Sequence, residues 1–307
     1  MPADVANPGA GAGLAAPVGL VVGRSGRAAL LLSLPAIALY VVIFCIPLLM
    51  TFVLSFRTFD LTTGAMGHGL TLERYFDVLS DPYFYEVFAR TFLIAAIVTV
   101  ISVVLGTPEA YILSRLRPPW RSVFLLIVLG PLLVSVVVRT LGWAILLGNS
   151  GLLNQALMSI GIVSTPLAMM YTNGAVVLGL VHISVPFVVI SVWTALQRHD
   201  PVLERAALAL GATRATVFMR VVIPQVMPGM LSGGIVAFSL AASAFATPAL
   251  LGGRGVKLVS TTVFDEFLGS LDWPLGAAIA VLLLLANTLI VVSYGRLVEG
   301  RYRESFR

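Results

Sequence analysis

The stretch HDPVLERAALALGATRATVFMRVVIPQVMPG, residues 199–229, decides the fold, because it begins as a polar loop between two long apolar runs. These runs, about 169–197 and 228–252, contain no Asp, Glu, Lys or Arg. As helices, each is long enough to cross a hydrocarbon core of about 30 Å. The loop between them is rich in small residues and patterned as a helix. We therefore expect two membrane spans joined by a loop that a soluble partner binds.

A short helix is expected at the start of this loop. Asp200 suits its N-cap, Pro201 suits its first turn, and Gly211 suits the left-handed position that ends a helix. Between them, apolar residues recur at i, i+3, i+4 and i+7, which gives the helix one apolar face. These residues are Leu203, Ala206, Ala207 and Leu210.

A second helix is expected from Thr213, which can cap it, to Pro224, which is expected to end it. Its apolar residues are expected to face the membrane bundle. The small residues of the first helix would let a partner groove close around its backbone, so docking of that helix in a groove is one interpretation. A helix that rests on lipid headgroups is the alternative.

The composition indicates a membrane protein. The chain has 307 residues, of which 59% are hydrophobic and 11% are charged, and its mean hydropathy is +1.01. A water-soluble domain of this size does not need so much apolar surface, so the lipid bilayer is the expected solvent. The distribution of the arginines accounts for the sequence pI of about 9.7, so no nucleic acid partner is expected.

Hydropathy predicts six membrane spans, at about 28–56, 87–113, 122–147, 169–197, 228–252 and 274–298. Of the 19 Lys and Arg residues, 12 lie in the two tails and in the loops 114–121 and 198–227, and Arg296 lies at the C-terminal end of the last span, next to the second tail. Cytoplasmic loops are enriched in these residues. Both termini and the 198–227 loop are therefore expected in the cytoplasm.

The expected organisation is a disordered cytoplasmic tail over residues 1–27, a six-span domain over 28–298 and a cytoplasmic tail over 299–307. The span at 228–252 has a surface of small residues, and Gly229 and Gly233 form a GxxxG pair that lets another helix approach closely. Tight packing within this chain is one interpretation. A subunit interface or a helix that lines a path is the other.

The loop resembles the EAA loop of ABC importer permeases, whose pattern is Glu-Ala-Ala, three residues, Gly, nine residues, Ile, any residue and Leu-Pro. Aligned on Gly211, the matching positions are Ala206, Ala207, Gly211 and Pro224, with Val221 and Ile223 as conservative substitutes. Arg205 stands where the family has Glu, and Glu204 lies one position earlier. The resemblance implies that the loop docks an ATPase through a coupling set of Glu204, Arg205, Ala206, Ala207, Leu210, Gly211, Val221, Ile223 and Pro224.

Three further motifs resemble the spermidine/putrescine branch of this family: VRTLGWAILLGNSGLLNQAL (138–157), FATPALLGG (245–253) and DWPLGAA (272–278). The resemblance implies an all-α, type I ABC importer bundle in the bacterial inner membrane. It also implies a second homologous permease, two cytoplasmic ATPase subunits and a periplasmic solute-binding protein as partners. The branch includes members for opines, amino-acid-like compounds and aminophosphonates, so the solute does not follow from it.

The sequence offers no chemistry for catalysis or for a bound cofactor. It contains no Gly-rich phosphate loop that ends in Gly-Lys-Ser/Thr, so ATP–Mg is expected only on partner subunits. Its three histidines, His68, His182 and His199, are scattered, which argues against a metal site. No catalytic residue is assigned, and an enzyme is not expected.

Three ionisable residues fall within spans, where a charge costs at least about 2.5–3.5 kcal/mol near the midplane, so they should face protein or water. We expect His182 to hydrogen-bond between helices. Glu109, four residues from the cytoplasmic end of its span, is expected either to extend its carboxylate to the interface or to pair with Arg115 or Arg117. Arg139 is either a gate or path residue, or an arginine that fixes helix geometry or reaches the outer interface. The candidate path residues are Arg139, Trp143, Ser239, Ser243 and Thr247.

The sequence therefore predicts the permease subunit of an ATP-driven importer. A periplasmic protein would deliver a polyamine-like or related amine or amino-acid-like solute to it. The alternative is a secondary transporter or channel that works without ATPases. Against that alternative, no inverted repeat is visible and no span has the paired charges of an ion-coupling site.

Overall fold

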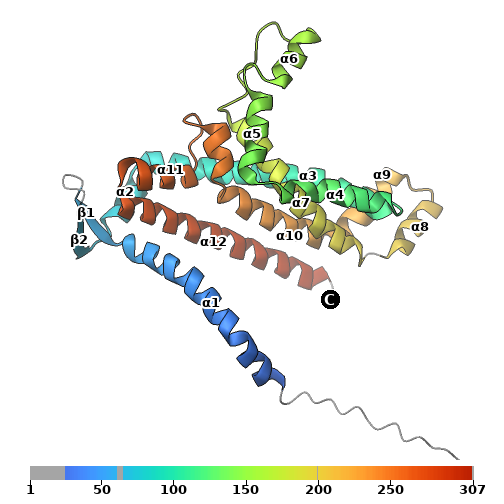
Figure 1. Ribbon diagram of the computed structural model, residues 1–307. Coiled ribbons are helices and arrows are strands. Elements are labelled where there is room, and N and C mark those ends of the chain that lie inside the picture. The colour runs from blue at the N-terminus through green and yellow to red at the C-terminus, as the bar shows by residue number, and fades with distance from the viewer. Residues whose placement is uncertain (1–24, 61–64, 199, 306–307) are drawn as a thin grey trace, which may run out of the picture. The chain divides into compact units, whose positions relative to one another are not determined.

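The computed structural model describes residues 25–60, 65–198 and 200–305, and its described part is almost entirely helical (Figure 1). Its elements are α1 (Ser25–Leu54), β1 (Arg57–Asp60), β2 (Ala65–Leu70), α2 (Glu73–Ser80), α3 (Pro82–Arg115), α4 (Trp120–Leu133), α5 (Val136–Leu147), α6 (Leu152–Ser159), α7 (Asn173–Leu196), α8 (Pro201–Ala209), α9 (Arg214–Val217), the π-helix η1 (Phe218–Val222), α10 (Ile223–Ala242), the π-helix η2 (Pro248–Gly252), α11 (Val259–Asp265), the π-helix η3 (Glu266–Ser270) and α12 (Trp273–Ser305).

The chain divides into two compact units, Met1–Met50 and Thr51–Arg307. In the described part of the first unit, α1 is a long apolar helix that contains Pro35 and Pro47. Of the expected tail at 1–27, residues 1–24 lie outside the described residues. At the other end of the chain, α12 continues through Ser305, so helix occupies most of the stretch that the sequence assigned to a C-terminal tail.

The described residues contain six helical stretches long and apolar enough to cross a membrane, which confirms the predicted number of spans. The third differs from the prediction, because the chain breaks after Leu133 and the long stretch begins at Val136. Val134 and Ser135 are extended there, so the expected span 122–147 is two helices, α4 and α5. The Gly130-Pro131 pair weakens the end of α4, since Pro131 donates no backbone hydrogen bond.

Three long helices, α3, α7 and α10, pack against one another and form the centre of the second unit (Figure 1). Their contact depends on glycine, because a Cβ at Gly229 would lie 2.7 Å from Cβ of Ala195, and a Cβ at Gly233 would lie 2.9 Å from Cα of Val188. The GxxxG pair of α10 therefore packs on α7 of the same chain. This confirms the interpretation of tight packing within the chain.

The helical path into α10 starts earlier than predicted and is not interrupted by proline. The stretch Arg214–Ala242 is helical throughout, and η1 joins α9 to α10. The backbone N–H of Ile223 donates to the carbonyl of Phe218, five residues back. The expectation that Pro224 ends the second helix was wrong, because the helical path continues past Pro224, the second residue of α10, directly after the π-helix η1.

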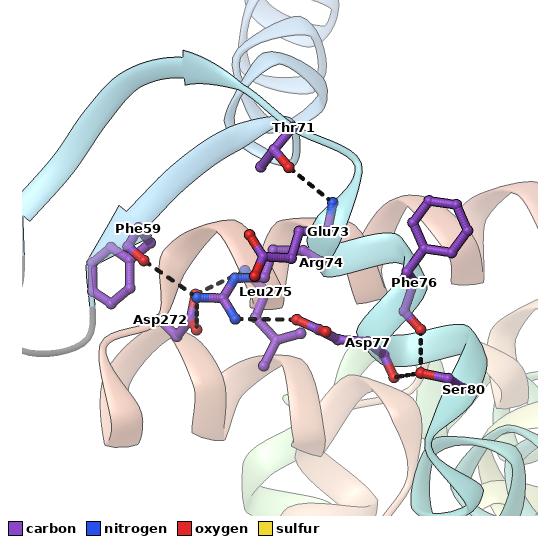
Figure 2. Close-up of polar contacts among 9 residues, drawn as sticks. All are labelled: Phe59, Thr71, Glu73, Arg74, Phe76, Asp77, Ser80, Asp272 and Leu275. Atoms are coloured by element: carbon purple, nitrogen blue, oxygen red, sulfur yellow. Dashed lines mark hydrogen bonds and ion pairs between the residues drawn. The ribbon is translucent and has the colours of Figure 1, made fainter.

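A two-stranded antiparallel hairpin, β1 and β2, leads into α2 and was not expected from the sequence. Next to it, Arg74 lies in a polar cluster that Figure 2 shows. Its guanidinium lies 3.2 Å from Asp77 and 3.1 Å from Asp272, and it donates to the carbonyl of Phe59 at 3.5 Å. Asp272 also accepts from the backbone N–H of Leu275, so the cluster ties β1 and α2 to the start of α12.

Candidate functional site

The first candidate site is α8 with the residues that flank it, which correspond to the predicted docking loop. The side chain of Asp200 accepts from the backbone N–H of Val202 at 2.9 Å and begins the helix as predicted. Gly211 has φ of +85°, the left-handed conformation expected after the helix end. Thr213 accepts from the N–H of Thr216 at 3.2 Å and caps α9. The predicted start and end of the first helix and the predicted start of the second are confirmed.

Most of α8 is exposed, although its sequence is mostly apolar. Leu203 and Leu210 are 52% and 89% exposed, Ala206 is exposed and Ala207 is half-buried. Among the residues of α8, only Glu204 is buried, at 4% exposure. The apolar residues of this short helix thus form a surface that the described residues leave open.

Glu204 turns inward and contacts the end of α3. Its carboxylate accepts from the hydroxyl of Tyr111 at 3.1 Å and forms an ion pair with Arg115. Arg115, one of the two partners considered for Glu109, pairs instead with this carboxylate of α8. Arg205 points away from this contact, is exposed and donates through Nε to the carbonyl of Pro201 at 3.4 Å.

The remaining residues of the predicted coupling set follow in η1 and α10. Val221 and Ile223 are half-buried and Pro224 is exposed. They lie where the helical path turns from the loop into the bundle. The predicted coupling set therefore runs from α8 through η1 into the first turn of α10.

The second candidate site comprises the predicted path residues, beginning with Arg139 on α5. A guanidinium nitrogen of Arg139 donates to the carbonyl of Pro131, while its Nε is buried without a hydrogen-bond partner. The break between α4 and α5 frees that carbonyl, since the helix no longer supplies an N–H four residues on. Of the alternatives for Arg139, these contacts match an arginine that fixes helix geometry.

Two further predicted path residues make contacts between helices. Trp143 Nε1 donates to Nδ1 of His182 at 3.1 Å, so His182 is the interhelical hydrogen-bonding residue that the sequence predicted. The hydroxyl of Thr247, which is 1% exposed, lies 3.3 Å from that of Thr140 on α5. Both contacts hold α5 against the rest of the bundle.

The two serines lie elsewhere and do not join this group. The hydroxyl of Ser243 donates to the carbonyl of Ser239 at 2.7 Å. Ser243 is exposed at the end of α10, and Ser239 is half-buried one turn earlier. Among the described residues, the structure brings together Trp143 with His182 and Thr140 with Thr247. It does not gather all five candidates into one lined pathway.

Sequence reasoning did not place three residues: Tyr111 and Arg115 at the docking loop, and Asp272 in the Arg74 cluster. Tyr111 and Arg115 lie four residues apart at the end of α3, a spacing that puts both on one helix face. That spacing was a usable signal, but nothing in the sequence showed which loop faces them. Asp272 opens the DWPLGAA motif, and its position before Trp273-Pro274 is typical of an N-cap.

Comparison with known proteins decides the family. No family model matches the chain. The spermidine/putrescine transport system permease PotB of Haemophilus influenzae is 33% identical over 251 residues, which is 82% of this chain and 87% of that protein. PotB of Escherichia coli is also 33% identical over 251 residues, covering 82% of this chain and 90% of its own length. This chain belongs to the ABC importer permease family.

A solved structure supports the fold of this permease. A crystal structure of a bacterial alginate ABC transporter, in complex with a periplasmic protein that holds an alginate pentasaccharide, contains a chain with a TM-score of 0.71 to this permease. The two chains are 16% identical, and the match covers 89% of this permease and 94% of that chain. At this identity the likeness shows the fold alone. The predicted all-α, six-span permease bundle is confirmed.

Proposed function

We propose that this permease subunit forms half of the translocation pathway of an importer for polyamine-like solutes. The PotB relatives support the solute class, because a third of the aligned residues are identical over most of both chains. A related amine or amino-acid-like compound is the wider solute class. A second, homologous permease completes the pathway.

Two cytoplasmic ATPase subunits drive transport, and one of them docks on α8. The observation that carries this step is the exposure of apolar residues on α8 and at its C-terminal end: Leu203 is 52% exposed, and Leu210, the residue after the helix, is 89% exposed. An amphipathic helix of this kind suits a groove on a partner protein. The chain itself binds no cofactor, and ATP–Mg lies on the ATPases. A periplasmic binding protein delivers the solute at the opposite face.

This arrangement requires one orientation in the bacterial inner membrane. With α8 on the cytoplasmic side, both termini are cytoplasmic, in agreement with the excess of Arg in the same set of loops. The Arg74 cluster, at the other end of the 34-residue helix α3, then lies on the periplasmic side.

The test is to co-express the permease with its neighbouring permease, ATPase and binding-protein genes and to reconstitute the complex in proteoliposomes. ATP hydrolysis and uptake are measured with spermidine and putrescine, and with maltose as a neutral control solute. We expect the ATPases to copurify and a polyamine to stimulate hydrolysis. Polyamine uptake by vesicles that contain the permease without ATPases would instead identify the secondary transporter or channel.

A further inference from the structure

Glu204 is unusual for a residue of a docking helix, because it is 4% exposed while most of α8 is open. A buried carboxylate is tolerated when it is paired and hydrogen-bonded. Glu204 obtains both from residues about ninety positions away in sequence, the hydroxyl of Tyr111 at 3.1 Å and the guanidinium of Arg115. The contact therefore joins two elements that are far apart along the chain.

The two partners of Glu204 form one unit at the end of α3. The guanidinium carbon of Arg115 lies 5.0 Å from the centre of the Tyr111 ring, and its nitrogen lies 3.4 Å from the Tyr111 hydroxyl. The same ring lies 5.1 Å from the ring of Phe218 in η1. Tyr111 thus touches the loop on both sides, through Glu204 in α8 and Phe218 at the entrance to α10.

The position of this contact matters because α3 is a central helix of the bundle. Its buried residues Ala110 and Leu113 belong to the same apolar cluster as Val188 and Val192 of α7 and Val226 of α10. Charge-assisted hydrogen bonds are directional and stronger than neutral ones. A displacement of α8 is therefore transmitted to α3 in whichever direction α8 moves. An apolar contact alone would let α8 slide over α3.

We infer that Arg115 and Tyr111 are positioning residues that join α8 to α3 through Glu204, so that the two helices move as one unit during transport. This rests on the proposed docking of an ATPase at α8. The adjacent Arg205, which stands at the family's Glu position, is exposed and does not take this role. Glu204, one position earlier, is the residue that faces α3.

The first experiment compares Arg115→Gln and Arg115→Lys with Arg117→Gln, a matched control on an exposed arginine two residues away. The complex is reconstituted with its binding protein, and uptake per ATP hydrolysed is measured with spermidine and putrescine. We expect Arg115→Gln to retain copurifying ATPases and to lose at least about fivefold in uptake per ATP, the low end of typical coupling between sites. Arg115→Lys should retain more than half of the wild-type uptake per ATP, and Arg117→Gln should match the wild type. Wild-type coupling in Arg115→Gln, or an equal loss in Arg117→Gln, overturns the inference.

A second experiment is a double-mutant cycle of Arg115→Gln and Glu204→Gln, which tests whether the two side chains act through one contact. Each single variant and the double variant is reconstituted with the binding protein, and uptake per ATP hydrolysed is compared with that of the wild type. We expect the double variant to lose no more than the more severe single variant, because either change removes the same ion pair. Losses that multiply in the double variant show that the two residues act independently and overturn the inference. Failure of the ATPases to copurify with the wild type would instead overturn the proposed docking.

Discussion

Trp143 Nε1 donates a hydrogen bond of 3.1 Å to Nδ1 of His182, and the two rings meet edge to face with their centres 5.7 Å apart. The bond links α5 to α7 directly. Because α5 is separated from α4 by a break, such contacts between helices fix its position. Trp143 was selected from the sequence as a path residue, and its observed contact is with a neighbouring helix.

The Trp143–His182 bond predicts the effect of removing its donor. Trp143→Phe retains an aromatic ring and loses the N–H, so the imidazole nitrogen has no partner in a partly buried site. We expect a loss of about 1 kcal/mol in the free energy of unfolding, measured as a lower thermal midpoint of the purified complex in detergent. Trp120→Phe is the control, since Trp120 is 63% exposed at the start of α4. An equal effect of the two substitutions would contradict the role of the bond.

Glycine at the α7–α10 contact gives a second prediction. In Gly229→Ala the new methyl group would lie 2.7 Å from Cβ of Ala195 and 2.8 Å from the carbonyl oxygen of Ser191, so the helices must separate. We expect a loss of about 1–3 kcal/mol in stability, the usual range for an overpacked core. Gly142→Ala is the matched control in α5, because its Cβ would have nothing within 4 Å. The control change should raise helix stability by about 1 kcal/mol. Thermal midpoints of Gly229→Ala and Gly142→Ala that shift in the same direction would refute the explanation.

Sequence reasoning predicted the elements that depend on local signals. The Asp200-Pro201 start, the left-handed Gly211 and the Thr213 cap follow from the chemistry of one or two residues each. The number of spans follows from the length of apolar runs. The close packing of Gly229 and Gly233 was one of two interpretations, and only the position of Ala195 and Val188 on α7 could decide between them.

The features that the sequence did not predict depend on contacts between distant segments. Hydropathy treats 122–147 as one apolar run, because two residues in an extended conformation, Val134 and Ser135, do not break a window that is apolar on both sides. The partner of Arg115 could not be chosen, because Glu109 is near in sequence while Glu204 is near only in the fold. Pro224 was taken as a helix end because the π-helix that carries the chain past it has no distinct sequence signal.

The cluster around Arg74 gives a third prediction. The side chain of Asp272 is 4% exposed, pairs with Arg74 and caps α12. The side chain of Asp77, in the same cluster, is 47% exposed. Removing one partner of a buried ion pair typically costs about 3–5 kcal/mol, and an exposed pair contributes about 0–1 kcal/mol. We therefore expect Asp272→Ala to lower the thermal midpoint far more than Asp77→Ala. Similar midpoints for the two variants would show that the pair with α12 does not stabilise the fold.

The last prediction concerns docking on α8. Ala206 is exposed on this helix, and a carboxylate there would have to be desolvated inside a groove that closes on small residues. We expect Ala206→Asp to lose most of the ATPase that copurifies with the wild type, while Ala206→Ser, which is small and uncharged, retains it. The bundle itself should be unaffected, because the side chain at 206 does not face it, so both variants should keep the wild-type thermal midpoint as isolated permeases. Full copurification and wild-type uptake in Ala206→Asp would rule out α8 as the docking helix, whatever solute the transporter carries.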